Sequence, residues 1–308
     1  MKFYLAPMEG ITGHVYRNAH RECFGSLDRY FTPFLASKKL SAKEKKEVSP
    51  DNNTGMDVIP QILTNRADEF IAIAGQLEQR GYTTVNLNLG CPSGTVTAKN
   101  RGAGFLKVTD ELEIFLEEIF KSCPLKISIK TRIGAYYIEE FEKIIEIYNK
   151  FPLEELIIHP RLMTDFYNGE PRLEIFEQAI LQSIHPICYN GDINSVSDYK
   201  RLVERFPNID RIMLGRGILA NPGLVDEIRG EAPVTTEKLR EFHSLLYKAY
   251  KAEMADERNT LFKMKELWVF MSKFFVTSEQ ILRNIRKAGS FMEYEIAVRN
   301  AMKMDRKI

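Results

Sequence analysis

The sequence of 308 residues lacks several features that would assign it to a specialised class of protein. It has no run of about 18 apolar residues, so no segment is predicted to cross a membrane. Its first ten residues, MKFYLAPMEG, have no long apolar core, so no secretory signal peptide is expected. The four cysteines form no Cys-x-x-Cys pair, which argues against a zinc site or a redox dithiol. We therefore expect a cytoplasmic protein with reduced thiols, no membrane contact and no metal.

The sequence also has little net charge, because its lysines and arginines exceed its acidic residues by only one. No overall electric field therefore points to a particular partner. The charge is uneven, however, since residues 235–308 carry 15 Lys and Arg against 10 Asp and Glu. Two interpretations of this segment stay open: an ordinary solvated helical face, or a surface for a polyanionic partner.

Short apolar segments alternate with amphipathic ones along residues 1–232. The segments predicted as strands are 3–6, 30–35, 58–63, 85–89, 126–130, 155–159, 186–190 and 211–214. The segments between them carry apolar residues at helical spacing, as in 139–150 with Phe141, Ile144, Ile145 and Tyr148. Eight such alternations predict an α/β fold, a (β/α)₈ or TIM barrel.

Two other segments complete the predicted organisation. The Lys-rich segment 38–53 reads as an exposed excursion between two strands. After Pro233 every segment reads as helix, and strand-like runs are absent from the sequence. We therefore predict a barrel domain at 1–232 and a small all-α domain at 233–308, joined by a linker near Gly230–Pro233.

The stretch 85–106, VNLNLGCPSGTVTAKNRGAGFL, carries the clearest candidate for chemistry. A short strand ends at Gly90, and a loop rich in Gly, Ser, Thr, Lys and Arg follows, which we expect to be exposed and mobile. Cys91 lies at this junction, and in parallel α/β proteins the carboxyl ends of strands carry the active site. Its thiol could act as a general acid, a general base or a nucleophile with His159, and the sequence does not separate these roles. Cys23, Cys123 and Cys188 fit the more common role of apolar filler.

Polar side chains recur where the other predicted strands end. They are Glu9 beside Pro7 and Met8, Gln61, Asn88, Lys130 with Arg132, His159 with Arg161, Asn190–Gly191–Asp192, and Gly215–Arg216–Gly217. Each alone could be structural, for example a buried amide, a core histidine or an ordinary glycine turn. Their recurrence at successive strand ends favours one site, and glycine turns after the last two barrel strands commonly bind phosphate.

Six motifs together resemble the tRNA-dihydrouridine synthase family. They are LAPMEGIT at 5–12, NLNLGCPSGTVTAKNRGAGFL at 86–106, IKTRIG at 129–134, IIHPR at 157–161, YNGDI at 189–193 and IMLGRGIL at 212–219. The resemblance covers the whole predicted barrel, and a helical C-terminal region of this length is also similar to the family. It implies an FMN-dependent enzyme that reduces a uridine in tRNA to 5,6-dihydrouridine, with NADPH or NADH as the electron donor.

The resemblance also implies roles for individual residues. Those implied to bind FMN are Pro7, Met8, Glu9, Gln61, Lys130, His159, Asn190, Gly191, Asp192, Gly215 and Arg216. Cys91 is implied to donate a proton to C5 of the uracil after hydride reaches C6. Those expected to contact the RNA are Asn88, Lys99, Arg101 and Arg132 in the barrel, and Arg283, Arg286 and Lys287 in the helical segment.

Three alternatives stay open at this point. A barrel flavoenzyme for a small molecule, such as a dihydroorotate dehydrogenase, has a similar Asn-x-Asn-x-x-Cys-Pro strand end, but needs neither the basic loop nor the helical segment. An RNA-binding protein on an inactive barrel would bind no flavin. A ribosomal RNA uridine could replace the tRNA uridine. We expect a monomer, and the sequence specifies neither the modified position nor the preferred nicotinamide cofactor.

Overall fold

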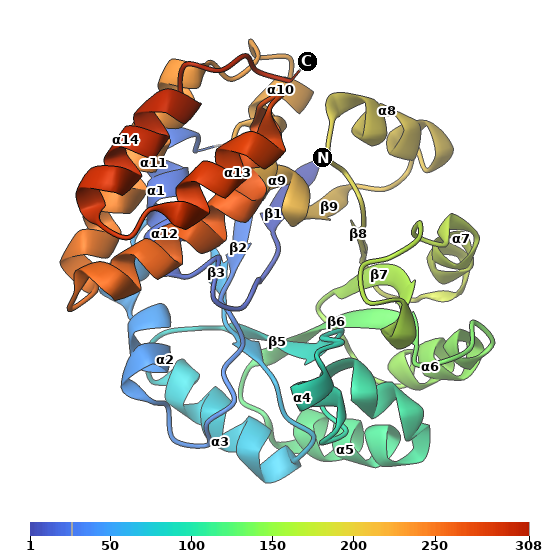
Figure 1. The fold of residues 1–308 in the computed structure, drawn as a ribbon. Helices are drawn as coiled ribbons and strands as arrows, with labels where there is room; N and C mark the ends of the chain where they lie inside the picture. Colours follow the sequence, from blue (N-terminus) through green and yellow to red (C-terminus); the bar gives the residue numbers. More distant parts are fainter. Residues whose placement is uncertain (26, 308) are drawn as a thin grey trace.

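The computed structural model describes residues 1–25 and 27–307. The strands of these residues form one sheet in the order β3-β2-β1-β9-β8-β7-β6-β5-β4, and its ladders are parallel. The ends of this order, β3 (Val58–Ile59) and β4 (Gln61–Ile62), are separated in the chain only by Pro60, which has no N–H to donate. The sheet therefore closes, and residues 58–62 act as one interrupted strand. This confirms the predicted eight-stranded barrel, which Figure 1 shows as a ring of strands inside a ring of helices.

Two of the strands run further at their carboxyl ends than the sequence predicted. Besides β3 and β4, the strands are β1 (Lys2–Leu5), β2 (Arg29–Phe31), β5 (Thr84–Leu89), β6 (Lys126–Gly134), β7 (Leu156–Leu162), β8 (Ile187–Asn190) and β9 (Arg211–Leu214). Because β6 and β7 extend further, Arg132 and Arg161 lie within strands rather than after them. Pro160 is tolerated inside β7 because the pairing of β7 with β8 ends at Ile158.

Strand residues alternate between the barrel interior and the layer under the helices. Tyr4 and Ala6 belong to a small interior cluster with Phe31 and Met213. Phe3 and Leu5 face outward into the large core that the helices cover. This alternation is the two-residue period of a strand whose two faces are both buried.

The helices that follow the barrel strands surround the sheet. They are α1 (His14–Cys23), α3 (Ala67–Glu78), α5 (Thr109–Ser122), α6 (Glu140–Tyr148), α7 (Leu173–Gln182) and α8 (Val196–Arg205), with the shorter α4 (Gly94–Thr97), α9 (Arg216–Ala220) and α10 (Leu224–Ile228). Ser195 caps α8, because its side chain accepts a hydrogen bond from the Asp198 amide. Asp110 lies in the first turn of α5, which begins at Thr109.

The C-terminal helices pack beside α1 on one side of the barrel (Figure 1). They are α11 (Thr236–Glu253), α12 (Glu257–Met271), α13 (Ser278–Lys287) and α14 (Phe291–Ala301). The Phe242 ring of α11 meets the rings of Tyr16, His20 and Phe24 edge to face. One apolar core runs from the barrel helices into these helices. That residues 233–308 form a separate RNA-binding domain stays a prediction.

The segment 38–53 is exposed at all of its lysines, as the sequence suggested, but it is not exposed throughout. It forms α2 (Ala42–Glu47) and the 3₁₀ helix η1 (Pro50–Asn53), and Glu47 and Asn53 are buried. The reason is Arg17 of α1, which is also buried and donates hydrogen bonds to both of these side chains. A charge inside the protein requires such partners, so Arg17 holds the polar segment against the barrel.

The loop after Cys91 is only partly the exposed segment that we expected. Lys99 is exposed, but the 3₁₀ helix η2 (Gly102–Lys107) buries Phe105 and Leu106 almost completely. A side chain at Gly102 would lie 2.8 Å from the Cys91 carbonyl oxygen, and its φ of +57° also favours glycine. The second half of the loop therefore packs under Cys91 and fixes its backbone.

None of the helices in the described part of the chain is both long and apolar enough to span a membrane. Within the same residues, no three His, Cys, Asp or Glu side chains come together in a way that could hold a metal ion.

Candidate active site

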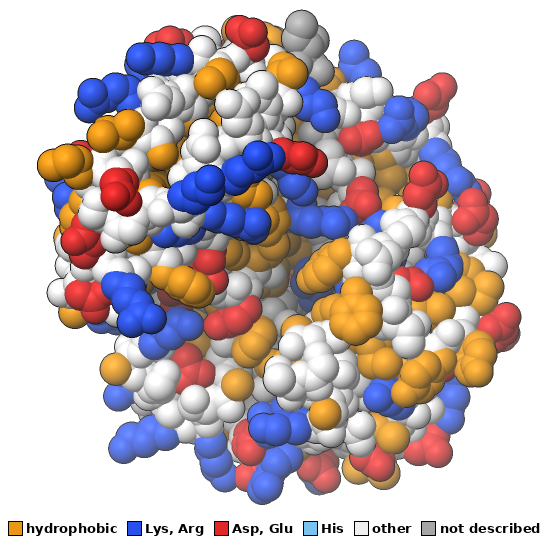
Figure 2. All heavy atoms as spheres, in the orientation of Figure 1, with side chains coloured by type: hydrophobic (Ala, Val, Ile, Leu, Met, Phe, Trp, Pro, Cys, Tyr) orange, Lys and Arg blue, Asp and Glu red, His pale blue; other side chains and the backbone are white. Residues whose placement is uncertain are grey.

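One pocket of about 260 Å³ opens at the carboxyl end of the barrel strands. Figure 2 shows it as the hollow near the middle of this face. The sequence-predicted residues that line it are Pro7, Met8, Glu9, Gln61, Asn88, Cys91, Lys130, Arg132, His159, Asn190, Gly191, Asp192, Gly215 and Arg216. The fold thus brings the polar strand ends together, because parallel strands of a barrel end on one face.

Asn88 organises the end of β5. Its side-chain oxygen accepts hydrogen bonds from the amides of Gly90 (3.0 Å) and Cys91 (2.9 Å). Its nitrogen donates to the Gln61 oxygen at 2.7 Å, and the Gln61 nitrogen donates to Asn86 at 2.7 Å. Both amides are therefore fixed inside the barrel, and the turn that carries Cys91 is held from below.

The Cys91 thiol lies half-buried at the wall of the pocket. Burial raises its pKa above the ordinary value, and the nearby charges of Lys130 and Arg132 oppose this rise. The thiol therefore keeps its proton at neutral pH. The two cations would stabilise the thiolate that forms once the proton is given away. This arrangement suits a general acid better than a nucleophile that is already ionised.

Lys130 and His159 are both shifted toward their neutral forms. Burial, with a contribution from Arg132, lowers the pKa of Lys130 to about 8. Burial also lowers the pKa of His159 well below its usual value, and four surrounding cations add to the effect. The Arg161 guanidinium lies 2.9 Å from His159 Nε2 and can only donate, so the imidazole proton belongs on Nδ1. His159 is thus a neutral ring with its acceptor already used.

Asp192 links two arginines at the ends of β7 and β9. Its carboxylate accepts two hydrogen bonds from buried Arg161, at 3.1 and 2.7 Å, and another from Arg216. These partners lower the Asp192 pKa in spite of its burial. Asp192 therefore acts in this structure as the group that orients Arg216, which faces the pocket beside the Gly191 and Gly215 backbone.

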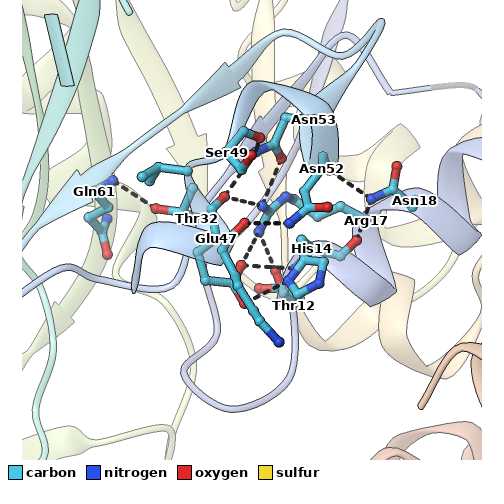
Figure 3. Close-up of polar contacts among 12 residues, drawn as sticks. Thr12, His14, Arg17, Asn18, Thr32, Glu47, Ser49, Asn52, Asn53 and Gln61 are labelled. Atoms are coloured by element: carbon cyan, nitrogen blue, oxygen red, sulfur yellow. Dashed lines mark hydrogen bonds and ion pairs between the residues drawn. The ribbon is translucent and has the colours of Figure 1, made fainter. Parts of the chain in front are cut away.

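A buried polar network around Thr12 and Arg17, drawn in Figure 3, supports the turn that carries Pro7, Met8 and Glu9. The Thr12 hydroxyl accepts from the Met8 amide at 2.8 Å and donates to the Ala6 carbonyl at 3.2 Å. Arg17 donates to the Thr12 carbonyl at 3.0 Å and to Glu47 at 3.0 Å. The pocket wall at Met8 is therefore tied through α1 to α2.

Five of the predicted residues lie outside the pocket. Lys99 is exposed on the loop after Cys91, and Arg101 pairs with Glu69 at 2.9 Å. Arg283, Arg286 and Lys287 are exposed together on α13. Within the described residues, these three side chains have no hydrogen bond or ion pair, and Figure 2 shows a row of basic side chains over this part of the molecule, beside the hollow. Their role in RNA binding stays a prediction.

The structure also adds residues that the sequence did not single out for the site. Phe34, Tyr167 and Asn194 line the pocket. Tyr167 is the most informative, because its ring lies 5.4 Å from the Arg132 guanidinium and 5.1 Å from that of Arg216. It comes from a loop in which no motif marks it, so only the folded chain shows its position.

Comparison with known proteins agrees with this geometry. The sequence model of the dihydrouridine synthase family matches residues 4–305. A protein of Staphylococcus aureus (strain Mu50), named probable tRNA-dihydrouridine synthase, is 26% identical over 280 residues, which is 87% of this chain and 84% of that protein. The tRNA-dihydrouridine synthase B of Pasteurella multocida (strain Pm70) is 27% identical over 227 residues, or 72% of this chain and 67% of that protein.

Solved structures with a similar fold are more distant in sequence. Morphinone reductase has a TM-score of 0.51 and 11% identity, over 78% of this chain and 88% of that one. A variant of NCR from Zymomonas mobilis has a TM-score of 0.52 and 13% identity, over 78% of this chain and 90% of that one. At this level of identity the likeness concerns the barrel fold alone.

Proposed function

The chain belongs to the dihydrouridine synthase family and is an enzyme, and from this premise we propose that it reduces a uridine of tRNA to 5,6-dihydrouridine with FMN and NADPH or NADH. The observation that carries the proposal is the placement of the Cys91 thiol in the same pocket as Lys130, Arg216 and the glycine turns. A flavin enzyme for this reaction needs these two elements side by side, a proton donor and a cofactor site.

The residues of the pocket fit a flavin mononucleotide. Lys130 and the Gln61 amide line the pocket, where they could contact the carbonyl groups of a flavin ring. Arg216, oriented by Asp192, lies with the Gly191 and Gly215 backbone at the ends of the last two strands, where a phosphate would bind. Pro7 and Met8 add apolar side chains to the pocket lining. When bound and reduced by NADPH or NADH, the flavin would supply the hydride that uracil C6 receives.

Cys91 would supply the proton that completes the reaction. Hydride addition at C6 leaves negative charge on C5 and the O4 carbonyl, and the thiol then gives its proton to C5. Because its pKa is raised by burial, the thiol is protonated at neutral pH and is ready to act. Lys130 and Arg132 would stabilise the thiolate until solvent returns a proton.

Asn88 and Arg132 would hold the target base. Asn88 Nδ2 has two hydrogens and gives one to Gln61, which leaves one for a ligand. Arg132 spends three of its five N–H donors on the carbonyls of Gly90, Leu162 and Phe166. Two further donors have no partner among the described residues, and a uracil carbonyl would suit them. The base must leave the RNA stack to reach this depth.

Exposed cations around the pocket would bind the RNA backbone. Lys99 lies on the loop beside Cys91, and Arg283, Arg286 and Lys287 lie on α13. A small substrate needs neither group, and this favours RNA over a small molecule. The family relatives are named for tRNA, so we propose tRNA as the substrate.

The test is to incubate the purified protein with an unmodified tRNA transcript and NADPH or NADH, and to analyse the digested nucleosides by mass spectrometry. We expect dihydrouridine at a defined position and release of FMN when the protein is denatured. Turnover of dihydroorotate without any dihydrouridine in tRNA would favour the small-molecule alternative. A protein that binds RNA but no flavin would contradict the proposed chemistry.

A further inference from the structure

Four aromatic side chains stand exposed on two loops at the pocket: Tyr167 (52% exposed) lines it, and three others lie beside it. Tyr136 (48% exposed) and Tyr137 (69%) follow β6, and Phe166 (49%) follows β7. We name these three residues the aromatic shelf. Figure 2 shows a group of apolar side chains at the rim of the hollow, opposite the basic row over α13. Large aromatic surfaces left in water usually mark a binding surface.

The loops that carry the shelf are held in place. The Thr164 amide and hydroxyl both contact the Ala135 carbonyl at 3.3 Å, which ties the second loop to the first. The Tyr136 amide donates to the Glu140 carboxylate at 3.2 Å. Phe166 adopts a φ of +51°, which is unfavourable for a bulky residue, and Arg132 binds its carbonyl oxygen. The shelf is therefore preorganised, so little entropy is lost when a ligand covers it.

The charges around the shelf suit a nucleic acid. The Lys107 ammonium lies 5.5 Å from the centre of the Tyr136 ring and is exposed, so it could reach a phosphate while it covers that ring. Arg132 connects the shelf to the pocket, since it contacts Phe166 and also lines the site where the target base would enter. A ligand on the shelf would thus be continuous with a ligand in the pocket.

We propose that Tyr136, Tyr137 and Phe166 stack against the unpaired bases of the RNA loop that flank the target uridine. This inference rests on the proposed function, because it assigns a place to the nucleotides next to the base in the pocket. Extraction of one base removes a stacking partner from its neighbours, and aromatic side chains can replace that partner regardless of base identity. The aromatic shelf would lower the free energy needed to extract the target base from the RNA stack. The α13 cations would hold the RNA backbone on the other side of the hollow.

The first test is the affinity of the flavin-loaded protein for tRNA. Tyr137→Ala should weaken binding about 5- to 150-fold, the range for loss of one base–aromatic stack. Tyr137→Phe should bind like the wild type, because it keeps the ring. The slope of affinity against salt concentration should not change, since no charge is lost. Leu181→Ala is the matched control: this apolar residue is also exposed, but it lies near the end of α7, away from the pocket face.

The second test places 2-aminopurine at each nucleotide that flanks the target uridine. Its fluorescence should be quenched by the wild type and by Tyr137→Phe, and quenching should be lost at one flanking position with Tyr137→Ala or Tyr136→Ala. Unchanged affinity and unchanged quenching in both alanine variants would overturn the shelf and point to another protein as its partner. A failure of the proposed function looks different, because the wild type would then form no dihydrouridine whatever the shelf variants bind.

Discussion

The protonation state of Cys91 follows from two opposing effects on one side chain. Burial disfavours the thiolate and dominates, so the pKa is raised, while Lys130 and Arg132 favour the thiolate. The wild-type thiol therefore keeps its proton at neutral pH and can act as an acid. Cys91→Ala should lower dihydrouridine formation by roughly 10²- to 10⁴-fold, the usual value for loss of a general acid, because C5 would take its proton from water. Single-turnover formation of dihydrouridine in tRNA measures this step.

The Cys91 variant needs controls that separate chemistry from binding. Flavin content and tRNA affinity should stay close to the wild-type values in Cys91→Ala, since the backbone contacts of the turn come from Asn88. Cys123→Ala removes another half-buried thiol outside the pocket and should stay active. Product formation in Cys91→Ala at the wild-type rate would exclude the thiol from the mechanism.

Residues of the site could be anticipated from sequence only where a strand end marks them. Cys91, Lys130 and Asn190 follow regular apolar alternation, so their place on the barrel face is predictable. Tyr167 and the support role of Arg17 are not, because they depend on loop conformations and on partners distant in the chain. Glu47, the partner of Arg17, is 30 residues away, in a segment whose composition suggests exposure.

Among the elements, α13 carries the prediction about RNA. Arg283, Arg286 and Lys287 share its exposed surface, while Ile281 and Ile285 face the core. Arg286→Glu should weaken tRNA binding and reduce its salt slope by about one, because one phosphate contact is lost. Reduction of the bound flavin by the nicotinamide cofactor should stay normal. Filter binding at several salt concentrations measures the slope.

A matched charge reversal distinguishes this contact from a general effect of charge. Lys200 is exposed on α8 and has no side-chain partner among the described residues, so Lys200→Glu changes the same charge away from α13. It should leave the salt slope unaltered. If both variants weaken binding equally, α13 has no special role and its basic residues are an ordinary solvated face.

Strands and helices with regular periodicity were the elements that could be predicted. The eight barrel strands and the long amphipathic helices follow from local patterns, because each pattern is set by which faces are buried. The α2 segment and η2 were missed for the opposite reason. Their burial depends on a single charged partner and on glycine contacts, which leave no periodic trace in the sequence.

At the scale of the whole molecule, buried histidines in the barrel and in the C-terminal helices make the stability of the fold depend on pH. Burial lowers the pKa of His20 in α1 and of His243 in α11 to about 4, and that of His159 in the pocket also falls well below its usual value. The unfolded chain takes up protons on these residues below about pH 6.5, whereas the folded protein does not. Their neutral forms therefore support the fold at neutral pH, and this support is lost as pH falls from about 6.5 toward 4.

The size of this loss can be stated for the two histidines with a pKa of about 4. Between pH 8 and pH 5, each should remove about 2 kcal/mol from the free energy of unfolding, and His159 should add to the loss. Because His20 packs against Phe242 of α11, the barrel and the C-terminal helices should lose stability in one transition. Urea unfolding followed by far-UV circular dichroism and by the fluorescence of Trp268 tests both points.

His243→Gln separates the histidine effect from general acid denaturation. The Tyr294 hydroxyl accepts a hydrogen bond from Trp268, so its own hydrogen is available to His243 Nε2. A glutamine can still accept this hydrogen bond, but it does not titrate. The variant should be less stable at pH 8 because the packing of the imidazole is lost, yet its stability should fall by about 2 kcal/mol less than that of the wild type on going to pH 5. Carboxylates that are paired in the fold, such as Glu47 and Asp192, titrate at lower pH and should affect both proteins alike. Equal losses of stability in the variant and the wild type would mean that His243 takes up a proton in the folded state. Two separate unfolding transitions would mean that the C-terminal helices unfold independently of the barrel.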